Sequence, residues 1–236
     1  MQNIGIMMRF IPKVLKIVSF TTLLFLLFSI IEVIGFRFIN PPFTPLMVIR
    51  YFQHDKKYGE RKIEKQWKDL DDISPNMVLA VVSAEDNNFP THFGVDWKAI
   101  KIAQERNKKG KRIHGGSTIT QQTAKNVFLV PNRSYIRKAF ELYYTYLIEI
   151  FWSKERIMEV YLNVVELGRG VYGVEAASQK YFKTSAKNLT RGQAALVTTA
   201  LPSPRKRNLA KPSKYMYQYQ ARVMDLMKMI GKVELK

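Results

Sequence analysis

The sequence predicts a mainly α-helical protein with one N-terminal transmembrane helix. Residues 17–36 are mostly apolar and carry one charge, Glu32, and as a helix they are long enough to cross the ~30 Å hydrocarbon core of a bilayer. Downstream, residues that commonly begin helices, such as Ser74 followed by Pro75, precede segments with helical patterning. Strand signals are few by comparison.

The basic flank of the apolar run predicts its orientation. Arg9, Lys13 and Lys16 precede the run and favour a cytoplasmic N-terminus, which places the rest of the chain outside. A cleaved signal peptide is the alternative, but the bulky residues 36–38 provide no small-residue cleavage site. We therefore expect a cytoplasmic N-terminus and signal anchor over residues 1–39, and one further domain over residues 40–236.

Proline and capping residues divide this domain into helices. Three prolines between Asn40 and Pro45 exclude a helix interior and mark the exit from the membrane. A further helix follows the capping residue Asp96. The other predicted helices span about 75–86, 118–128, 134–152, 153–162, 172–182, 191–201 and 213–230.

Composition narrows the class of function. The chain has 38 Lys+Arg against 19 Asp+Glu, a net charge of +19, which implies an anionic partner such as nucleic acid, an acidic membrane surface or a phosphorylated substrate. It has no cysteine, which excludes a thiol nucleophile and cysteine-ligated metals. The 3 histidines lack HExxH spacing, so a zinc hydrolase is disfavoured.

Two adjacent carboxylates, Glu85 and Asp86, end an otherwise apolar helix. Partial burial at such a position raises the pKa of a carboxyl group towards that of a useful general base. An exposed helix end, where acidic residues are common, explains the same pattern.

A second polar cluster begins at the glycine pair 115–116. The helix start that follows offers unpaired N–H groups to an anion. Hydroxyl and amide side chains add neutral donors as far as Lys125 and Asn126. An ordinary capped helix is the alternative interpretation.

Two further segments also allow two interpretations. Arg137 and Glu141 share a helix face, which fits a surface ion pair or a carboxylate beside phosphate-binding cations. Gly168, Gly170 and Gly173 match GxGxxG, but no βαβ unit surrounds them. We expect these glycines to allow a tight turn and close helix approach rather than to bind a dinucleotide.

Together, these segments resemble the ordered motifs of the peptidoglycan glycosyltransferases (family 51). The motifs are EDNNFPTHFGVD from Glu85, GGSTITQQTAKN from Gly115, RKAFE from Arg137 and ERIMEVYLNVVELGRGVYGVEAASQKYF from Glu155. The segment ALVTTALPSP at 195–204 is similar to the family's closing motif. The resemblance covers about residues 40–210.

The resemblance implies a lysozyme-like glycosyltransferase domain with a head lobe and a membrane-proximal jaw lobe. It implies polymerisation of lipid II into glycan strands, by attack of the acceptor 4-hydroxyl on the lipid-pyrophosphate-linked chain with inversion. Glu85 matches the family's base, and Glu141 its second catalytic carboxylate. The substrate-binding residues that the resemblance implies are Asp86, Phe89, His92, Gly116, Ser117, Thr118, Gln121, Gln122, Lys125, Asn126, Arg133, Arg137 and Lys138.

The same resemblance implies partners and a location. The expected partners are lipid II, the growing lipid-linked glycan chain, membrane lipid, and other cell-wall synthases and division proteins, with no nucleic acid. A divalent cation, magnesium or manganese, is expected without a defined site, Glu141 being one candidate ligand, and no nucleotide is required. The catalytic domain would lie in the periplasm, anchored in the bacterial inner (plasma) membrane, and serve cell wall biogenesis and cell shape.

Two alternatives from other classes fit part of the pattern. A lysozyme-like glycan-cleaving enzyme also uses paired carboxylates, but it needs no cations for a leaving phosphate. A membrane-tethered polyanion-binding protein would explain the charge, but it gives Glu85 no role.

Overall fold

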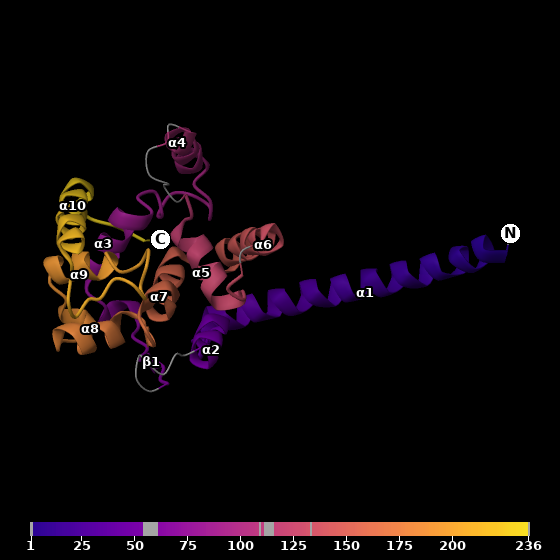
Figure 1. The fold of residues 1–236 in the computed structure, drawn as a ribbon, viewed down its shortest axis with the longest axis horizontal. Helices are drawn as coiled ribbons and strands as arrows, with labels where there is room; N and C mark the ends of the chain where they lie inside the picture. Colours follow the sequence, from indigo (N-terminus) through magenta and orange to yellow (C-terminus); the bar gives the residue numbers. More distant parts are fainter. Residues whose placement is uncertain (1, 54–60, 109, 111–115, 133, 236) are drawn as a thin grey trace. The chain divides into compact units, whose positions relative to one another are not determined.

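The structure is a computed structural model that describes residues 2–53, 61–108, 110, 116–132 and 134–235. The chain divides into two compact units, Met1–Ile39 and Asn40–Lys236. Both consist mainly of helices, so the prediction of a mainly α protein is confirmed (Figure 1).

The first unit is a single helix, α1 (Gln2–Phe38). Its segment Lys13–Phe38 has a mean hydropathy of 2.4 and is long and apolar enough to cross a membrane. Most side chains along this segment are exposed, and an apolar exposed surface suits contact with lipid. By length and composition, α1 is a candidate for the membrane helix that the sequence predicts.

The second unit consists of helices and one small sheet. Its elements are α2 (Pro45–Phe52), β1 (Glu64–Lys65), η2 (Leu70–Asp72), α3 (Pro75–Glu85), α4 (Trp97–Lys108), α5 (Ile119–Phe128), α6 (Tyr135–Phe151), α7 (Lys154–Val164), β2 (Glu166–Gly168), β3 (Val171–Tyr172), α8 (Val174–Phe182), η3 (Ala186–Asn188), α9 (Arg191–Thr198) and α10 (Lys214–Ile230).

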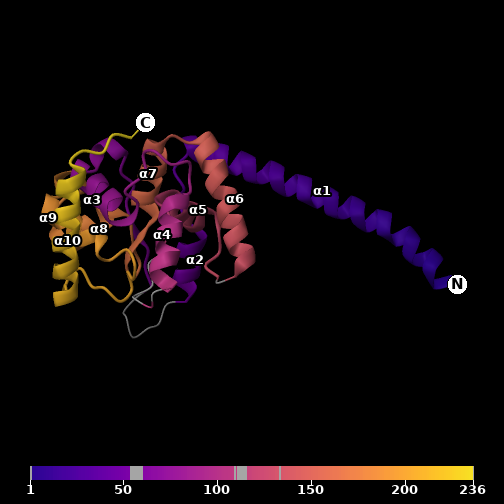
Figure 2. The ribbon, with the colours of Figure 1, turned by 90° about the horizontal axis from the view of Figure 1, so that it is seen from above.

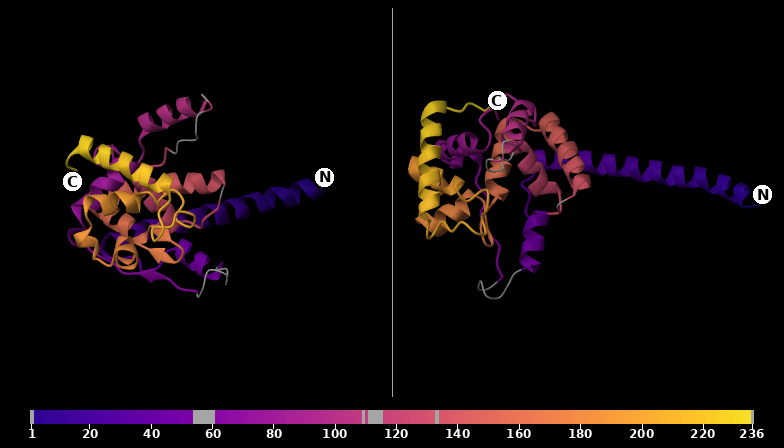
Figure 3. Two further views of the ribbon diagram at one scale, coloured as in Figure 1. Left: turned by 60° about the vertical axis from the view of Figure 1, so that its left-hand side comes forward. Right: turned by 45° about the horizontal axis from the view of Figure 1, so that its top comes forward.

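The helices of this unit pack in two groups. α3 packs against α9 and α10, and α5 packs against α6 and α7. Figures 1 and 2 show α9 and α10 at one end of the unit and α6 at the other, with α7 between them. α4 projects away from both groups (Figures 1 and 3). The core includes Ile157, Tyr161 and Leu162 of α7, whose side chains are fully buried.

Capping side chains begin the helices where the sequence predicts them. Ser74 accepts a hydrogen bond from the N–H of Asn76, with Pro75 in the first turn of α3. Thr118 and Gln121 form a reciprocal capping box at the start of α5. The predicted helices after Ser74 are confirmed, with ends that agree to within about three residues.

The helix α2 and the small sheet are among the elements that the sequence analysis did not predict. The helix α2 begins immediately after the proline-rich exit segment, where Thr44 caps it and Pro45 occupies its first turn. The sheet has the order β1-β3-β2, with β1 parallel and β2 antiparallel to β3. Its strands are two or three residues long, which is too short to show an alternating pattern.

Gly173 allows α8 to start against the backbone of α7. Its φ is 79° and its ψ is 158°, a conformation that is essentially restricted to glycine. A Cβ atom there would lie 2.7 Å from the carbonyl oxygen of Asn163. The expectation of a tight turn and a close helix approach is therefore confirmed at this position.

We expect Gly173→Ala to destabilise the protein by about 3 kcal/mol, because backbone strain and a backbone clash add together. That loss corresponds to a melting temperature lower by about 6–12 °C for a domain of this size. Gly231→Ala is the matched control: Gly231 also has positive φ, at 76°, but no atom of the described residues lies within 4 Å of the position that a Cβ would take. Thermal melting of both variants in detergent checks this, and equal losses would contradict the close-approach argument.

Candidate active site

Glu85 is the last residue of α3 and meets two other helices. Its Oε2 accepts a hydrogen bond from Nε2 of Gln122 on α5, at 2.9 Å. Oε1 of Gln122 in turn accepts a hydrogen bond of 3.3 Å from the hydroxyl of Tyr161 on α7. Glu85 is half-buried rather than solvated, so the structure favours the first of its two interpretations over an exposed helix end.

The surroundings of Glu85 act on its pKa in opposite directions. Burial raises the pKa of the Glu85 carboxyl group above its usual range, and this is the largest effect. The hydrogen bond from Gln122 and the positive charges of Lys125 and Arg207 lower the pKa. A carboxylate made more basic by burial, yet kept ionisable by nearby cations, suits a general base.

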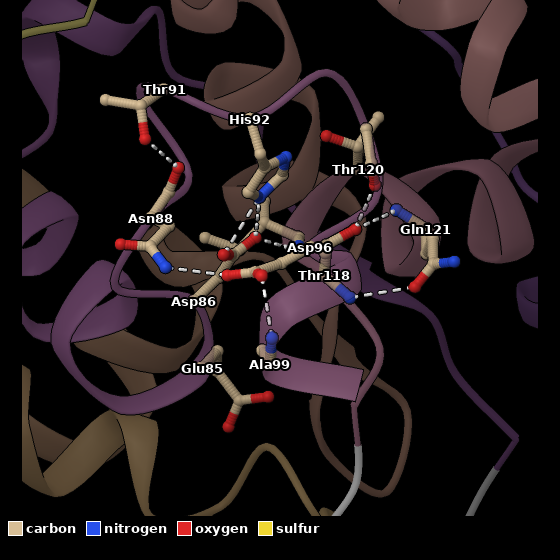
Figure 4. A network of polar contacts seen from close by, with 12 residues as sticks. Glu85, Asp86, Asn88, Thr91, His92, Asp96, Ala99, Thr118, Thr120 and Gln121 are labelled. Atoms are coloured by element: carbon tan, nitrogen blue, oxygen red, sulfur yellow. Dashed lines mark hydrogen bonds and ion pairs between the residues drawn. The ribbon is translucent and has the colours of Figure 1, made fainter. Parts of the chain in front are cut away.

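Asp86, next to Glu85, points into a separate polar network. Both of its carboxylate oxygens lie 2.9 Å from Nε2 of His92. Oδ2 also accepts the backbone N–H of Ile119, in the first turn of α5, at 2.9 Å. Figure 4 shows Glu85 pointing away from this network. The two neighbouring carboxylates therefore have different surroundings.

Further hydrogen bonds fix the loop after Asp86 against α5. Thr118 donates its hydroxyl to the carbonyl oxygen of Gly94 at 2.6 Å. Asp96 accepts from the side chain of Asn88 and from the backbone N–H of Ala99, both at 2.7 Å. The first two polar motifs of the sequence are thus joined by hydrogen bonds (Figure 4).

Glu141, on α6, is a buried carboxylate held by two cations. Its side chain is 3% exposed, and Oε2 lies 2.7 Å from Nη1 of Arg137. Oε1 contacts Nζ of Lys138, which is itself about half exposed. Nearby, the charge of Glu141 raises the pKa of Lys125, although burial has the larger, lowering effect on that pKa. The predicted third motif is therefore a cation cluster around one carboxylate.

A cavity of about 660 Å³ lies beside these groups. Gln122, Lys125 and Asn126 line it from α5, and Arg137 lines it from α6. The remaining wall comes from α2, from the segment after α5, from Val165 and β2, and from the segment after α9. The ionisable residues that this wall adds are Arg50, Glu166, Arg205 and Lys206.

Several predicted substrate-binding residues do not line this cavity. Asp86 and Phe89 are buried, the side chain of His92 is 8% exposed, and Phe89 lies under Nζ of Lys154, 4.8 Å from its ring centre. Buried Thr118 and Gln121 cap α5. Their positions indicate that these five residues support the structure around the cavity and do not line it.

Three more predicted residues differ from one another in their placement. Gly116 packs against α4, since a Cβ there would lie 3.3 Å from Cγ1 of Ile100. Ser117 is exposed. Arg133 lies outside the described residues.

Sequence reasoning missed the far wall of the cavity. Arg50 was missed because α2 was not predicted as a helix. Arg205 and Lys206 belong to a basic run directly after the closing motif, and that run was the available signal. Glu166 lies within the fourth motif, but nothing in its local pattern distinguishes it from neighbouring residues.

The donor groups do not fit a metal held by the protein alone. In the part of the chain that the structure describes, no group of three His, Asp or Glu residues is placed to bind a metal ion. Both oxygens of Glu141 already contact cationic side chains. A divalent cation beside Glu141 would therefore have to draw most of its ligands from a bound substrate.

The family profile described as Transglycosylase matches residues 53–228. The chain belongs to the transglycosylase family. This membership confirms the predicted lysozyme-like glycosyltransferase fold and makes the protein an enzyme.

Relatives of this transglycosylase cover most of its length. Proteins named biosynthetic peptidoglycan transglycosylase are 46% identical in Bacteroides thetaiotaomicron (94% of this chain, 90% of the relative) and 53% identical in Bdellovibrio bacteriovorus (86% and 81%). A third, in Caulobacter vibrioides, is 47% identical (88% and 89%). The similarity therefore extends over most of the chain.

We expect Gln122→Ala to shift the acidic limb of the kcat/KM profile to higher pH. The variant removes a hydrogen bond that stabilises ionised Glu85, so the pKa of Glu85 rises and the base stays protonated up to a higher pH. Kinetics over a pH series measure the limb, with exposed Gln179→Ala as the control. A limb that stays in place or moves to lower pH in Gln122→Ala would reject this account of Glu85.

Proposed function

We propose that this transglycosylase polymerises lipid II into glycan strands with inversion at the anomeric carbon. Its relatives are named biosynthetic peptidoglycan transglycosylases. The observation that carries the proposal is the placement of Glu85: a half-buried carboxylate bonded to Gln122, with Lys125 of the same helix lining a cation-rich cavity.

Glu85 acts as the base. Its carboxylate takes the proton from the acceptor 4-hydroxyl, and the oxygen attacks the anomeric carbon of the donor chain. The bond from that carbon to the pyrophosphate breaks, and the electron pair leaves with the pyrophosphate. Attack on the face opposite the leaving group gives inversion.

Cations on the cavity wall stabilise the leaving pyrophosphate. Lys125 and Arg137 line the cavity, and positive charge there offsets the negative charge that grows on the departing oxygen. Glu141 holds the side chains of Arg137 and Lys138. We assign Glu141 the role of orienting these cations.

The cation-rich cavity disfavours a glycan-cleaving enzyme, because cleavage of a neutral glycosidic bond releases no phosphate. Such an enzyme needs one protonated carboxylic acid to donate a proton to the leaving oxygen. Both oxygens of Glu141 contact cationic side chains, so this second carboxylate is already engaged.

As a membrane anchor, α1 keeps the enzyme at the membrane that carries its lipid-linked substrate. We propose that α1 spans the inner membrane with its N-terminus in the cytoplasm, as the basic residues before the apolar run favour. Exposed apolar side chains in the second unit also suit a membrane surface. Examples are Phe52, at 69% exposure, and Ile136, at 71%. A lipid-linked substrate would then reach the cavity from the bilayer.

Glu85→Gln tests the proposal. The detergent-solubilised full chain is incubated with radiolabelled lipid II, and the products are separated on a gel. Wild type should form polymer, and Glu85→Gln should form it about a hundredfold more slowly or worse, because the base is lost. Its melting temperature should stay close to that of wild type.

Exposed Glu155, at the start of α7, provides the matched control, and Glu155→Gln should polymerise normally. Polymer formation by Glu85→Gln at the wild-type rate would remove Glu85 from the reaction. Release of fragments from preformed glycan by wild type, without polymer from lipid II, would support the cleaving enzyme instead.

A further inference from the structure

One acidic residue lines a cavity whose other charged groups are all cationic. Among the described lining residues, Glu166 is the carboxylate, and the cations around the wall are Arg50, Lys125, Arg137, Arg205 and Lys206. The proposed chemistry assigns no role to Glu166. Its charge would repel a pyrophosphate, so it indicates that part of the cavity serves a different chemical group.

The hydrogen-bonding capacity of Glu166 is largely unused. Its side chain is 7% exposed, and its ion pair to Arg50 is long, with 3.8 Å between Oε2 and Nε. That distance is beyond a hydrogen bond, and Nε of Arg50 is buried without a hydrogen-bond partner in the described structure. Burial raises the pKa of Glu166, as expected for a carboxylate that lacks close donors.

The sheet places a second donor beside this pair. Glu166 on β2 is paired across the sheet with Tyr172 on β3. The Tyr172 hydroxyl is buried, and within the described residues it has no hydrogen-bond partner. Buried polar groups in folded proteins normally have hydrogen-bond partners. In the described structure, two buried donors without a hydrogen bond lie beside a carboxylate whose ion pair is long, and this combination points to a bound ligand.

We propose that Glu166 and Arg50 form a subsite for a sugar ring of the substrate. Glu166 accepts a hydrogen bond from a hydroxyl group or from the N–H of an acetamido group, and Nε of Arg50 donates to an oxygen of the same sugar. This proposal rests on the proposed function, which it refines.

A sugar ring fits Glu166 and Arg50 better than the lipid tail or the pyrophosphate of the substrate does. A sugar hydroxyl both donates and accepts, so it can satisfy a carboxylate and a guanidinium that lie 3.8 Å apart. A lipid tail offers neither function. The pyrophosphate is attracted to Lys125 and Arg137, away from the negative charge of Glu166. The cavity would thus separate a sugar-binding wall from a phosphate-binding wall.

The test pairs protein variants with altered substrates. Lipid II analogues each lack one sugar hydroxyl other than the attacking 4-hydroxyl, or carry an ester in place of the acetamide N–H. Each is assayed for polymerisation with wild type, Glu166→Gln and Glu155→Gln. For one analogue, kcat/KM of wild type should fall by about ten- to a hundredfold, the typical effect of a hydrogen bond to a charged acceptor.

With Glu166→Gln, kcat/KM for that analogue should fall clearly less, relative to unmodified lipid II, than it does with wild type. The reason is that the variant already lacks the charged acceptor. With Glu155→Gln, kcat/KM for the analogue should fall as much as it does with wild type. Arg50→Gln provides a second variant if Glu166→Gln melts at a much lower temperature, and it should show the same coupling to an analogue. If every analogue lowers kcat/KM equally in wild type and in the folded variants, the proposed subsite is wrong. Absence of polymer from wild type and unmodified lipid II would instead reject the proposed function.

Discussion

The Asp86 carboxylate joins two stretches of the chain that are far apart in the sequence. It binds the ring of His92 and the backbone N–H of Ile119 at the start of α5. A carboxylate is favoured there, because the first N–H groups of a helix are unpaired and carry partial positive charge. The contact fixes the end of α3 against the start of α5. Glu85 and Gln122 depend on this junction, since one residue lies on each helix.

A buried ion pair supports the junction from the opposite side. Lys154 donates to the carbonyl oxygen of His92 at 2.6 Å and to Glu149 at 2.8 Å, and Thr120 donates to the same carboxylate oxygen at 2.6 Å. These contacts connect α6 and α7 to α5 and to the loop after Asp86. Removal of one partner of such a pair leaves an unpaired buried charge, which is costly. The arrangement holds these helices and the loop together through charges inside the protein.

The sequence predicted those features that depend on residues close together in the chain, such as the starts of helices. Caps such as Ser74 and Thr118 located helix starts, because a capping side chain acts within three residues. Local signals could not show that Asp86 and His92 face each other inside the protein, since the same polar residues would suit a substrate surface. They also could not place Arg50 beside Glu166, because that contact depends on how a helix near the membrane exit packs against a strand over a hundred residues later.

The central claim is that burial makes Glu85 a base while Gln122 and nearby cations keep it ionisable. A carbon-13 NMR titration of the Glu85 carboxyl group tests this most directly, in the full chain in detergent micelles, with Glu85→Gln to identify the signal. The account predicts a pKa above the usual glutamate value of about 4.3. A carboxyl group that titrates at or below that value would contradict it.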